Sequence, residues 1–126
     1  MVHVVKSDKP FQDVVNALPD VVVKNKFGVL GTHDLRKKMN EKGVAFERDC
    51  VVFEVCNPQK AKAVLEENME ISTALPCRIS VYREGGKTKL ATIKPTALLG
   101  MFPNPELGPV AEEVERTLFR IMMEAS

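Results

Sequence analysis

The most chemically suggestive stretch of the chain is the junction at which an apolar run ending in Cys56 meets the pair Asn57-Pro58. Asn is a preferred N-cap and Pro suits the first helical position, so the pattern predicts a strand that leads directly into a helix. A thiol at a helix start can have its pKa lowered and act as a thiolate nucleophile. Cys56 also fits a structural role, packing against Ala61 across the first turn, and we favour that role because small buried cysteines are common.

Two other residues with reactive side chains could join Cys56. Strand alternation places Glu54 on the same face as Cys56, so the two could line one pocket. Cys77 begins a later strand, and the hairpin register predicted below puts it opposite Lys94. A neighbouring ammonium would favour the Cys77 thiolate, whereas the structural alternative is that Cys77 closes a core layer while Lys94 extends into solvent.

His33 and Asp34 could act as a base and its orienting carboxylate, but adjacent residues rarely face each other on a helix, and helix capping is the favoured role for Asp34. The cysteine spacings match no zinc pattern, and the chain has no glycine-rich phosphate loop and no hydrolase or metalloprotease motif. We therefore predict no metal site, and the motifs identify neither a catalytic residue nor a cofactor. The candidate pocket comprises Cys56, Cys77, Glu54, Lys94, His33 and Asn57.

Hydrophobic periodicity indicates the elements that would position these residues. Apolar and β-branched runs predict strands over 3–6, 27–30, 45–55, 76–82 and 88–93, and Gly85-Gly86 supplies a two-residue hairpin turn that pairs Glu84 with Lys87. Helical spacing between these runs gives the order β-α-β-α-β-α-β-β-α. This order predicts an α+β fold, a two-layer sandwich with helices packed on one mixed, mostly antiparallel sheet.

Three details of this assignment depend on single residues. Pro19 should kink or end the first helix near Leu18. Asp34 or Thr32 should cap a short basic helix that stops at Gly43. The segment 68–75 has no clear period and is predicted to be a loop.

Composition limits the classes of function. A chain of 126 residues with 44% hydrophobic residues fits one domain, 1–126, and its formal charge of +1 comes from 18 basic and 17 acidic side chains. Because no basic stripe or spanning-length apolar run is present, we expect neither nucleic acid nor membrane as a partner. The odd number of cysteines and the lack of a signal-like start predict reduced thiols and a cytoplasmic location.

Several short motifs, taken in order, resemble a known family. They are Phe27-Gly28-Val29-Leu30 with Asp34, Cys56-Asn57-Pro58, Leu75-Pro76-Cys77 with Val81-Tyr82 and Glu84, Pro95 with Leu98-Leu99-Gly100, and Asn104-Pro105-Glu106-Leu107. The series resembles the bacterial and archaeal family called domain of unknown function 302. The resemblance implies a two-layer α+β domain similar to TATA-binding-protein-like sheets and a homodimer, and it implies no activity. Pro19 and Lys94 depart from the pattern.

Two hypotheses of function follow. The first is a small cytoplasmic dimeric domain that is non-catalytic or binds a small molecule, motivated by surplus apolar residues near the C-terminus. These are Leu98, Leu99, Met101, Phe102, Met122 and Met123. The alternative is a thiol-dependent redox or soft-metal site built on Cys56 and Cys77, with Glu54, Lys94 or His33 as tuning groups.

Overall fold

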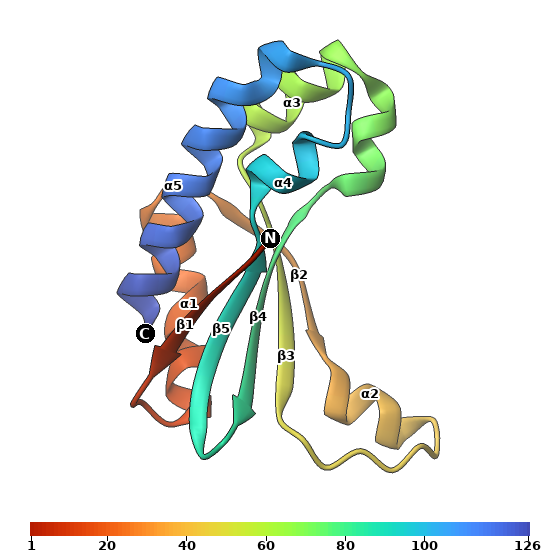
Figure 1. Ribbon diagram of the computed structural model, residues 1–126. Coiled ribbons are helices and arrows are strands. Elements are labelled where there is room, and N and C mark those ends of the chain that lie inside the picture. Colours follow the sequence, from red (N-terminus) through yellow and green to blue (C-terminus); the bar gives the residue numbers. More distant parts are fainter.

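A single antiparallel sheet with the strand order β1-β5-β4-β3-β2 organises the chain in the computed structural model, which describes residues 1–126 (Figure 1). The strands are β1 (Val2–Ser7), β2 (Gly28–Asp34), β3 (Cys50–Cys56), β4 (Cys77–Glu84) and β5 (Lys87–Ile93). The helices are α1 (Phe11–Lys24), α2 (Leu35–Glu41), α3 (Pro58–Glu67), α4 (Pro95–Leu99) and α5 (Gly108–Ala125), with short 3-10 helices η1 (Met69–Ala74) and η2 (Pro105–Leu107). The predicted α+β class is confirmed, and the element order matches the prediction apart from the additional short helix α4 between β5 and α5. Every strand pair is antiparallel.

The helices lie on one side of the sheet and beyond one of its ends. Helices α1 and α5 cover one face, whereas α3, α4 and the first turns of α5 extend past the end of the strands (Figure 1). Helix α2 projects from the β2 edge at the opposite end. No helix covers the other face of the sheet, which we call the open face. No helix is long and apolar enough to cross a membrane.

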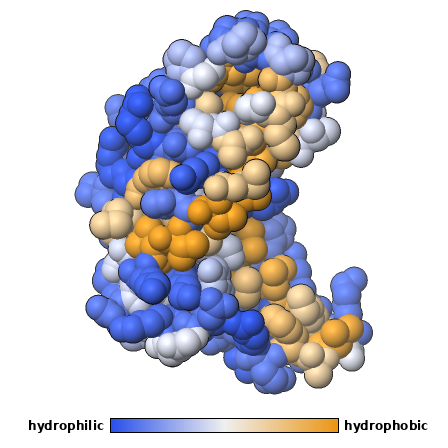
Figure 2. Space-filling view, in the orientation of Figure 1, coloured by the Kyte–Doolittle hydropathy of each residue, from blue (hydrophilic) through white to orange (hydrophobic).

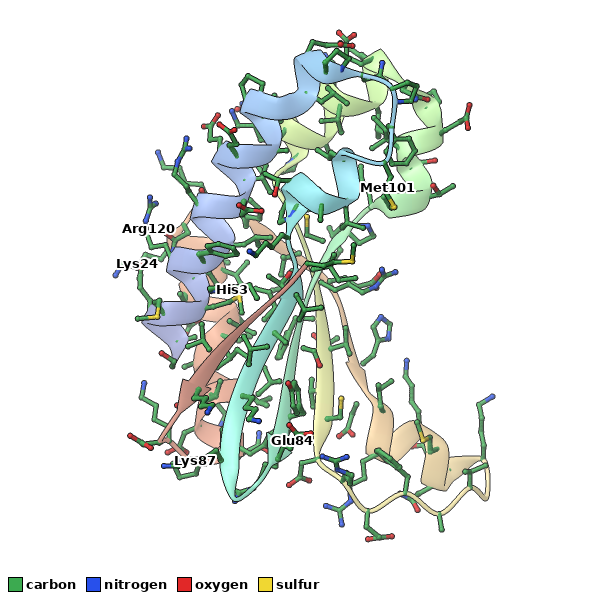
Figure 3. All side chains as sticks on the ribbon, viewed as in Figure 1. His3, Lys24, Glu84, Lys87, Met101 and Arg120 are labelled. Carbon is green, nitrogen blue, oxygen red and sulfur yellow. The ribbon has the colours of Figure 1, made fainter.

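The β4–β5 hairpin has the predicted register. Glu84 pairs with Lys87 and Val81 with Leu90, and Gly85 and Gly86 take φ angles of +60° and +73°. Positive φ at both central residues gives a turn whose twist matches that of the strands, which is why two glycines suit it. Glu84 and Lys87 lie at the end of the molecule remote from α4 (Figure 3).

The core lies between the sheet and the pair α1 and α5. Alternation on β3 holds as predicted, because Val51, Phe53 and Val55 are at most 6% exposed while the residues between them are half-buried. Helix α5 contributes Leu118, Ile121, Met122 and Ala125, all fully buried. These residues form the buried face of the C-terminal half of α5.

Pro19 does not end the first helix near Leu18, which was one of the two outcomes predicted for it. Helix α1 runs through Pro19 to Lys24. Val14, Leu18 and Val22 recur at a spacing of four and are fully buried against the core, so the apolar stripe continues past the proline. Burial of Val22 stabilises the last turn enough to offset the hydrogen bond that Pro19 cannot donate.

The segment predicted to be a loop at 68–75 is partly helical. Its residues 69–74 form η1, and Ile71 is fully buried with Val64 and Leu107 in a second, smaller apolar cluster under α3. The Asn68 side chain accepts from the backbone of Glu70 at 3.0 Å and begins this 3-10 helix. A helix of this length has too few turns for its period to be recognised in sequence.

Candidate functional site

An apolar pocket lies where the ends of β3 and β4 meet α3, α4 and α5. Its volume is about 40 Å³, which is room for a few water molecules or a small apolar group. Its wall consists of Phe27, Val55, Cys56, Asn57, Lys60, Ala61, Val64, Ala74, Leu75, Pro76, Cys77, Pro95, Leu98, Leu99, Val110 and Val114. Hydrophobic residues gather over this α3 and α4 end of the molecule in Figure 2.

The junction of β3 and α3 places Cys56 and Asn57 in the pocket wall. Asn57 Oδ1 accepts from the backbone N–H groups of Gln59 at 3.1 Å and Lys60 at 3.2 Å, and Pro58 is the first helical residue. The predicted N-cap is confirmed. Cys56 and Ala61 both line the pocket, so the first turn of α3 closes over the thiol.

Cys56 and Cys77 line the same pocket as free thiols. Burial raises the pKa of Cys77 to about 11, and the nearby charge that Cys56 would carry adds to this shift. Burial also raises the pKa of Cys56 above 9.0. These shifts are opposite to the lowering that a helix N-terminus would cause, so both groups are thiols at neutral pH and weak nucleophiles.

Lys94 is not among the pocket residues. The β4–β5 ladder ends at Ser80 and Ala91 and does not reach Cys77, so the expected ladder pair of Cys77 and Lys94 is wrong. Cys77 does pair with Val55 of β3, on the other side of β4. The Lys94 backbone N–H donates to the carbonyl of Met1 at 2.8 Å and so continues the pairing of β5 with β1, which ends at Val2 and Ile93. Local spacing predicted the register of the hairpin but not the length of its ladder.

His33 and Glu54 form a separate polar cluster on the open face. His33 Nε2 lies 2.7 Å from Glu54 Oε1, and Lys38 Nζ of α2 lies 2.7 Å from His33 Nδ1. Arg78 of β4 approaches the other carboxylate oxygen of Glu54 at 3.8 Å. The hydrogen bond from His33 is the main cause that lowers the pKa of Glu54.

The structure therefore divides the six predicted site residues. Cys56, Cys77 and Asn57 meet in the apolar pocket, His33 and Glu54 meet on the open face, and Lys94 joins neither group. Asp34 does not orient His33: its side chain caps α2 by accepting from the backbone of Lys37 at 3.0 Å, as favoured from the sequence.

Sequence reasoning missed Lys38 and Arg78, which flank the polar cluster. Arg78 faces Glu54 through the β3–β4 pairing, and Lys38 reaches back from α2 to His33. The only sequence signal was charge at exposed positions, which is too common to be specific. No group of three or more His, Cys, Asp and Glu side chains converges to hold a metal ion.

The fold and the two sites define a class of protein, an α+β domain in which one antiparallel sheet has a helical face and an open face. Residues 3–125 match the family model of Domain of unknown function DUF302, and the chain belongs to this family. It is similar to the crystal structure of an uncharacterized conserved protein DUF302 from Bacillus stearothermophilus, with 34% identity, a TM-score of 0.93, and coverage of 99% of this chain and 98% of that chain. No curated protein matches.

Proposed function

We propose that this protein is a ligand-binding domain that takes a small apolar molecule in the pocket at the end of β3 and β4. The observation that supports this proposal is the lining of the pocket, since 12 of its 16 residues are hydrophobic. A largely apolar cavity with a few polar groups is typical of small-molecule sites. The raised pKa values of Cys56 and Cys77 favour a binding role over thiolate catalysis.

The polar groups of the pocket indicate the chemistry of the ligand. Lys60 and Asn57 are the polar members of the lining, and the Lys60 ammonium is bound to Glu113 of α5 at 2.9 Å. Asn57 Oδ1 is occupied in capping α3. Because the Lys60 ammonium and Asn57 Oδ1 already have partners, the ligand gains its affinity mainly from apolar contact, and an apolar group of one or two heavy atoms suits the volume of about 40 Å³.

Two alanines of α3 allow a matched test. Ala61 lines the pocket, whereas Ala63 is exposed on the same helix. Methyl NMR spectra of the wild type exposed to xenon or ethane, which are small enough for the pocket, should show shifts at Leu98 and Leu99. Ala61→Met should abolish these shifts by filling the pocket, and Ala63→Met should preserve them. A wild type that responds to neither probe, or an Ala61→Met variant that responds equally, would contradict the proposal.

We also propose that the domain forms a homodimer through its open face. Val2 pairs with Ile93 and Val4 with Ala91, which brings exposed Val2, Val4 and Ile93 together at the β1 and β5 side of this face. The surplus apolar residues named from the sequence give less support to a dimer, because Met122 is fully buried and Leu98 and Leu99 line the pocket. A contiguous exposed apolar patch is typical of an interface.

Sedimentation velocity over a concentration series tests the dimer. Val4 is 44% exposed on the open face, and Val23 is 65% exposed on α1, on the helical side. The wild type should sediment as a dimer, Val4→Lys should sediment as a monomer, and Val23→Lys should behave as the wild type does. A monomeric wild type at high micromolar concentration would exclude the dimer.

A thiol-dependent site is the second candidate, favoured by one observation: Cys56 and Cys77 share the pocket. Such a site requires thiols that react at neutral pH as fast as a model thiol does, or a soft metal that co-purifies. We expect alkylation slower than that of a free thiol and no bound metal.

Two unpaired thiols in one pocket also suit a reducing compartment. We therefore propose a cytoplasmic location, which fractionation of cells would test.

A further inference from the structure

The polar cluster on the open face lies outside the apolar pocket and has its own chemistry. Glu54 of β3, His33 of β2 and Lys38 of α2 form a row in which each neighbouring pair is 2.7 Å apart. The side chains of His33 and Glu54 are 36% and 22% exposed, and Lys38 is exposed. The molecule is hollowed alongside β2, between the end formed by α3 and α4 and the projecting α2 (Figures 1 and 2).

The donors and acceptors in this row determine where the protons lie. A lysine ammonium can only donate, so His33 Nδ1 accepts from Lys38 and carries no proton. The single imidazole proton is then on Nε2, from which His33 donates to the carboxylate of Glu54. This arrangement satisfies all three side chains with a neutral imidazole.

The surrounding backbone is shaped to hold the row. Gly31 faces Glu54 across the β2–β3 ladder next to a register shift, and a Cβ at Gly31 would lie 2.8 Å from Glu54 Oε1 and 3.4 Å from His33 Nε2. Only glycine leaves that space. Helix α2 is held against β3 by Arg36, whose guanidinium donates to Asp49 at 2.8 Å. This ion pair ties the helix that carries Lys38 to the residue that precedes β3.

A second proton on His33 changes the balance of charge. The imidazolium would then face the Lys38 ammonium, and two cations in contact repel each other unless an anion lies between them. The other charged groups nearby do not supply that anion: Glu54 already accepts from Nε2, Arg78 is a cation, and Lys37 pairs with Glu41 on α2 at 3.9 Å. Glu54 in turn stabilises the imidazolium from the opposite side.

We propose that Lys38 and His33 form a binding site for a small oxyanion, such as a sulfate, phosphate or carboxylate group, and that binding is coupled to uptake of one proton at His33 Nδ1. In the bound state, the anion accepts from Lys38 Nζ and from His33 Nδ1–H, and Nε2–H still donates to Glu54. The site therefore gains affinity as pH falls, because Lys38 is a donor in both states whereas His33 Nδ1 becomes a second donor toward the anion only in the imidazolium.

Sulfate and formate are suitable probes because both keep their charge between pH 5.5 and pH 8. NMR signals of the His33 ring and of the backbone amides of residues 31–38 in the full chain should shift on addition of each probe at constant ionic strength adjusted with chloride, and the amide signals also report on variants that lack the ring. A response to both probes indicates a general oxyanion site, and a response to sulfate alone restricts the site to tetrahedral anions such as phosphate. The affinity should be higher at pH 5.5 than at pH 8, since the second donor toward the anion forms only when the imidazole takes up a proton.

Three variants distinguish anion binding at His33 and Lys38 from nonspecific screening of surface charge. His33→Gln keeps a polar side chain and should lose both binding and its pH dependence, and Lys38→Met should weaken binding at pH 5.5 by about tenfold. Lys37→Met removes the neighbouring exposed ammonium and should bind as the wild type does, with folding checked by urea denaturation. Equal affinity at the two pH values, equal loss in the Lys37 and Lys38 variants, or no response to either probe would overturn the proposal.

Discussion

At the scale of single residues, burial decides what the thiols can do. Cys56 sits where a helix N-terminus could favour a thiolate, yet burial raises its pKa. Cys77 is more deeply buried in the same pocket, and its pKa rises to about 11. Desolvation of the charged form outweighs the helix dipole here, because a largely apolar wall surrounds both sulfur atoms.

The raised pKa of Cys77 predicts a loss of stability in alkali. The unfolded thiol ionises near pH 9, whereas the folded thiol stays protonated up to about pH 11. The unfolded state therefore releases its proton first, and stability present below pH 9 is lost as pH rises toward 11. Cys77→Val should remove about 2 kcal/mol of this loss between pH 8 and pH 10.5, measured by urea denaturation.

Cys50 provides the control for this measurement. It lies near the open face, with its sulfur 3.8 Å from Ser80 Oγ, outside the apolar pocket. Cys50→Val should leave the alkaline slope of the wild type unchanged. An identical slope in Cys77→Val and the wild type would show that Cys77 does not ionise as its burial implies.

Replacing Gly31 with alanine should change the pKa of Glu54 while leaving the free energy of unfolding nearly unchanged. In Gly31→Ala the new methyl group would lie 2.8 Å from Glu54 Oε1, the flexible end of that side chain, so the carboxylate should turn away from His33. The pKa of Glu54, now held below 4.5 by His33, should rise toward its ordinary value. The free energy of unfolding should change by less than about 1 kcal/mol.

A carboxyl ¹³C NMR titration of Glu54 measures this shift. Gly28→Ala is the matched variant on the same strand, because the nearest atom to its Cβ is the Cys56 carbonyl oxygen at an ordinary 4.0 Å. Glu54 should titrate in that variant as it does in the wild type. An unchanged Glu54 pKa in Gly31→Ala would mean that the carboxylate does not depend on the space at Gly31.

At the scale of elements, α1 shows tertiary packing prevailing over local propensity. Pro19 costs a hydrogen bond inside the helix, but Val22 lies one turn beyond it and is fully buried. The expected end of the helix at Leu18 rested on the proline alone. The continued spacing of Val14, Leu18 and Val22 was the better indicator, because burial of one valine offsets much of the penalty.

Pro19→Ala is therefore expected to stabilise the protein. Alanine restores the missing N–H donor in the middle of α1, and the gain should reach up to about 3 kcal/mol in urea denaturation. Pro10→Ala serves as the control, since Pro10 is exposed at the N-cap of the same helix and interrupts no turn. A Pro19→Ala variant that is less stable than the wild type would show that α1 is shaped around the proline.

At the scale of the whole molecule, two apolar clusters of unequal size hold the chain together. The larger contains 15 buried residues between the sheet and the pair α1 and α5, and the smaller contains only Val64, Ile71 and Leu107 under α3. Met101, just after α4, is exposed at the α3 and α4 end of the molecule (Figure 3). The pocket lies between the two clusters, so its wall joins a more stable part to a less stable one.

Two fully buried isoleucines test this division. Ile71→Ala and Ile79→Ala should each cost about 2 to 5 kcal/mol, because each leaves a cavity in an apolar cluster. In native-state hydrogen exchange, Ile71→Ala should reduce protection mainly in α3 and η1, whereas Ile79→Ala should reduce it throughout the sheet. Loss of protection throughout the chain in both variants would show that the clusters unfold as one unit.

Much of the fold could be predicted because its signals are local. Asn57-Pro58 determined the start of α3, Asp34 the cap of α2, and Gly85-Gly86 the turn and register of the hairpin, each through hydrogen bonds or φ angles within a few residues. The alternation of Val51, Phe53 and Val55 determined which face of β3 is buried.

Only the tertiary structure decided which chemical groups meet. It placed Cys56 and Cys77 in one pocket, moved Glu54 away from them to His33, and brought Lys38 and Arg78 from other elements to complete the polar cluster. The sequence by itself determined the secondary structure around each of these residues. Their partners depend on strand order and on how α2 and α3 pack, and those follow from burial summed over the whole chain.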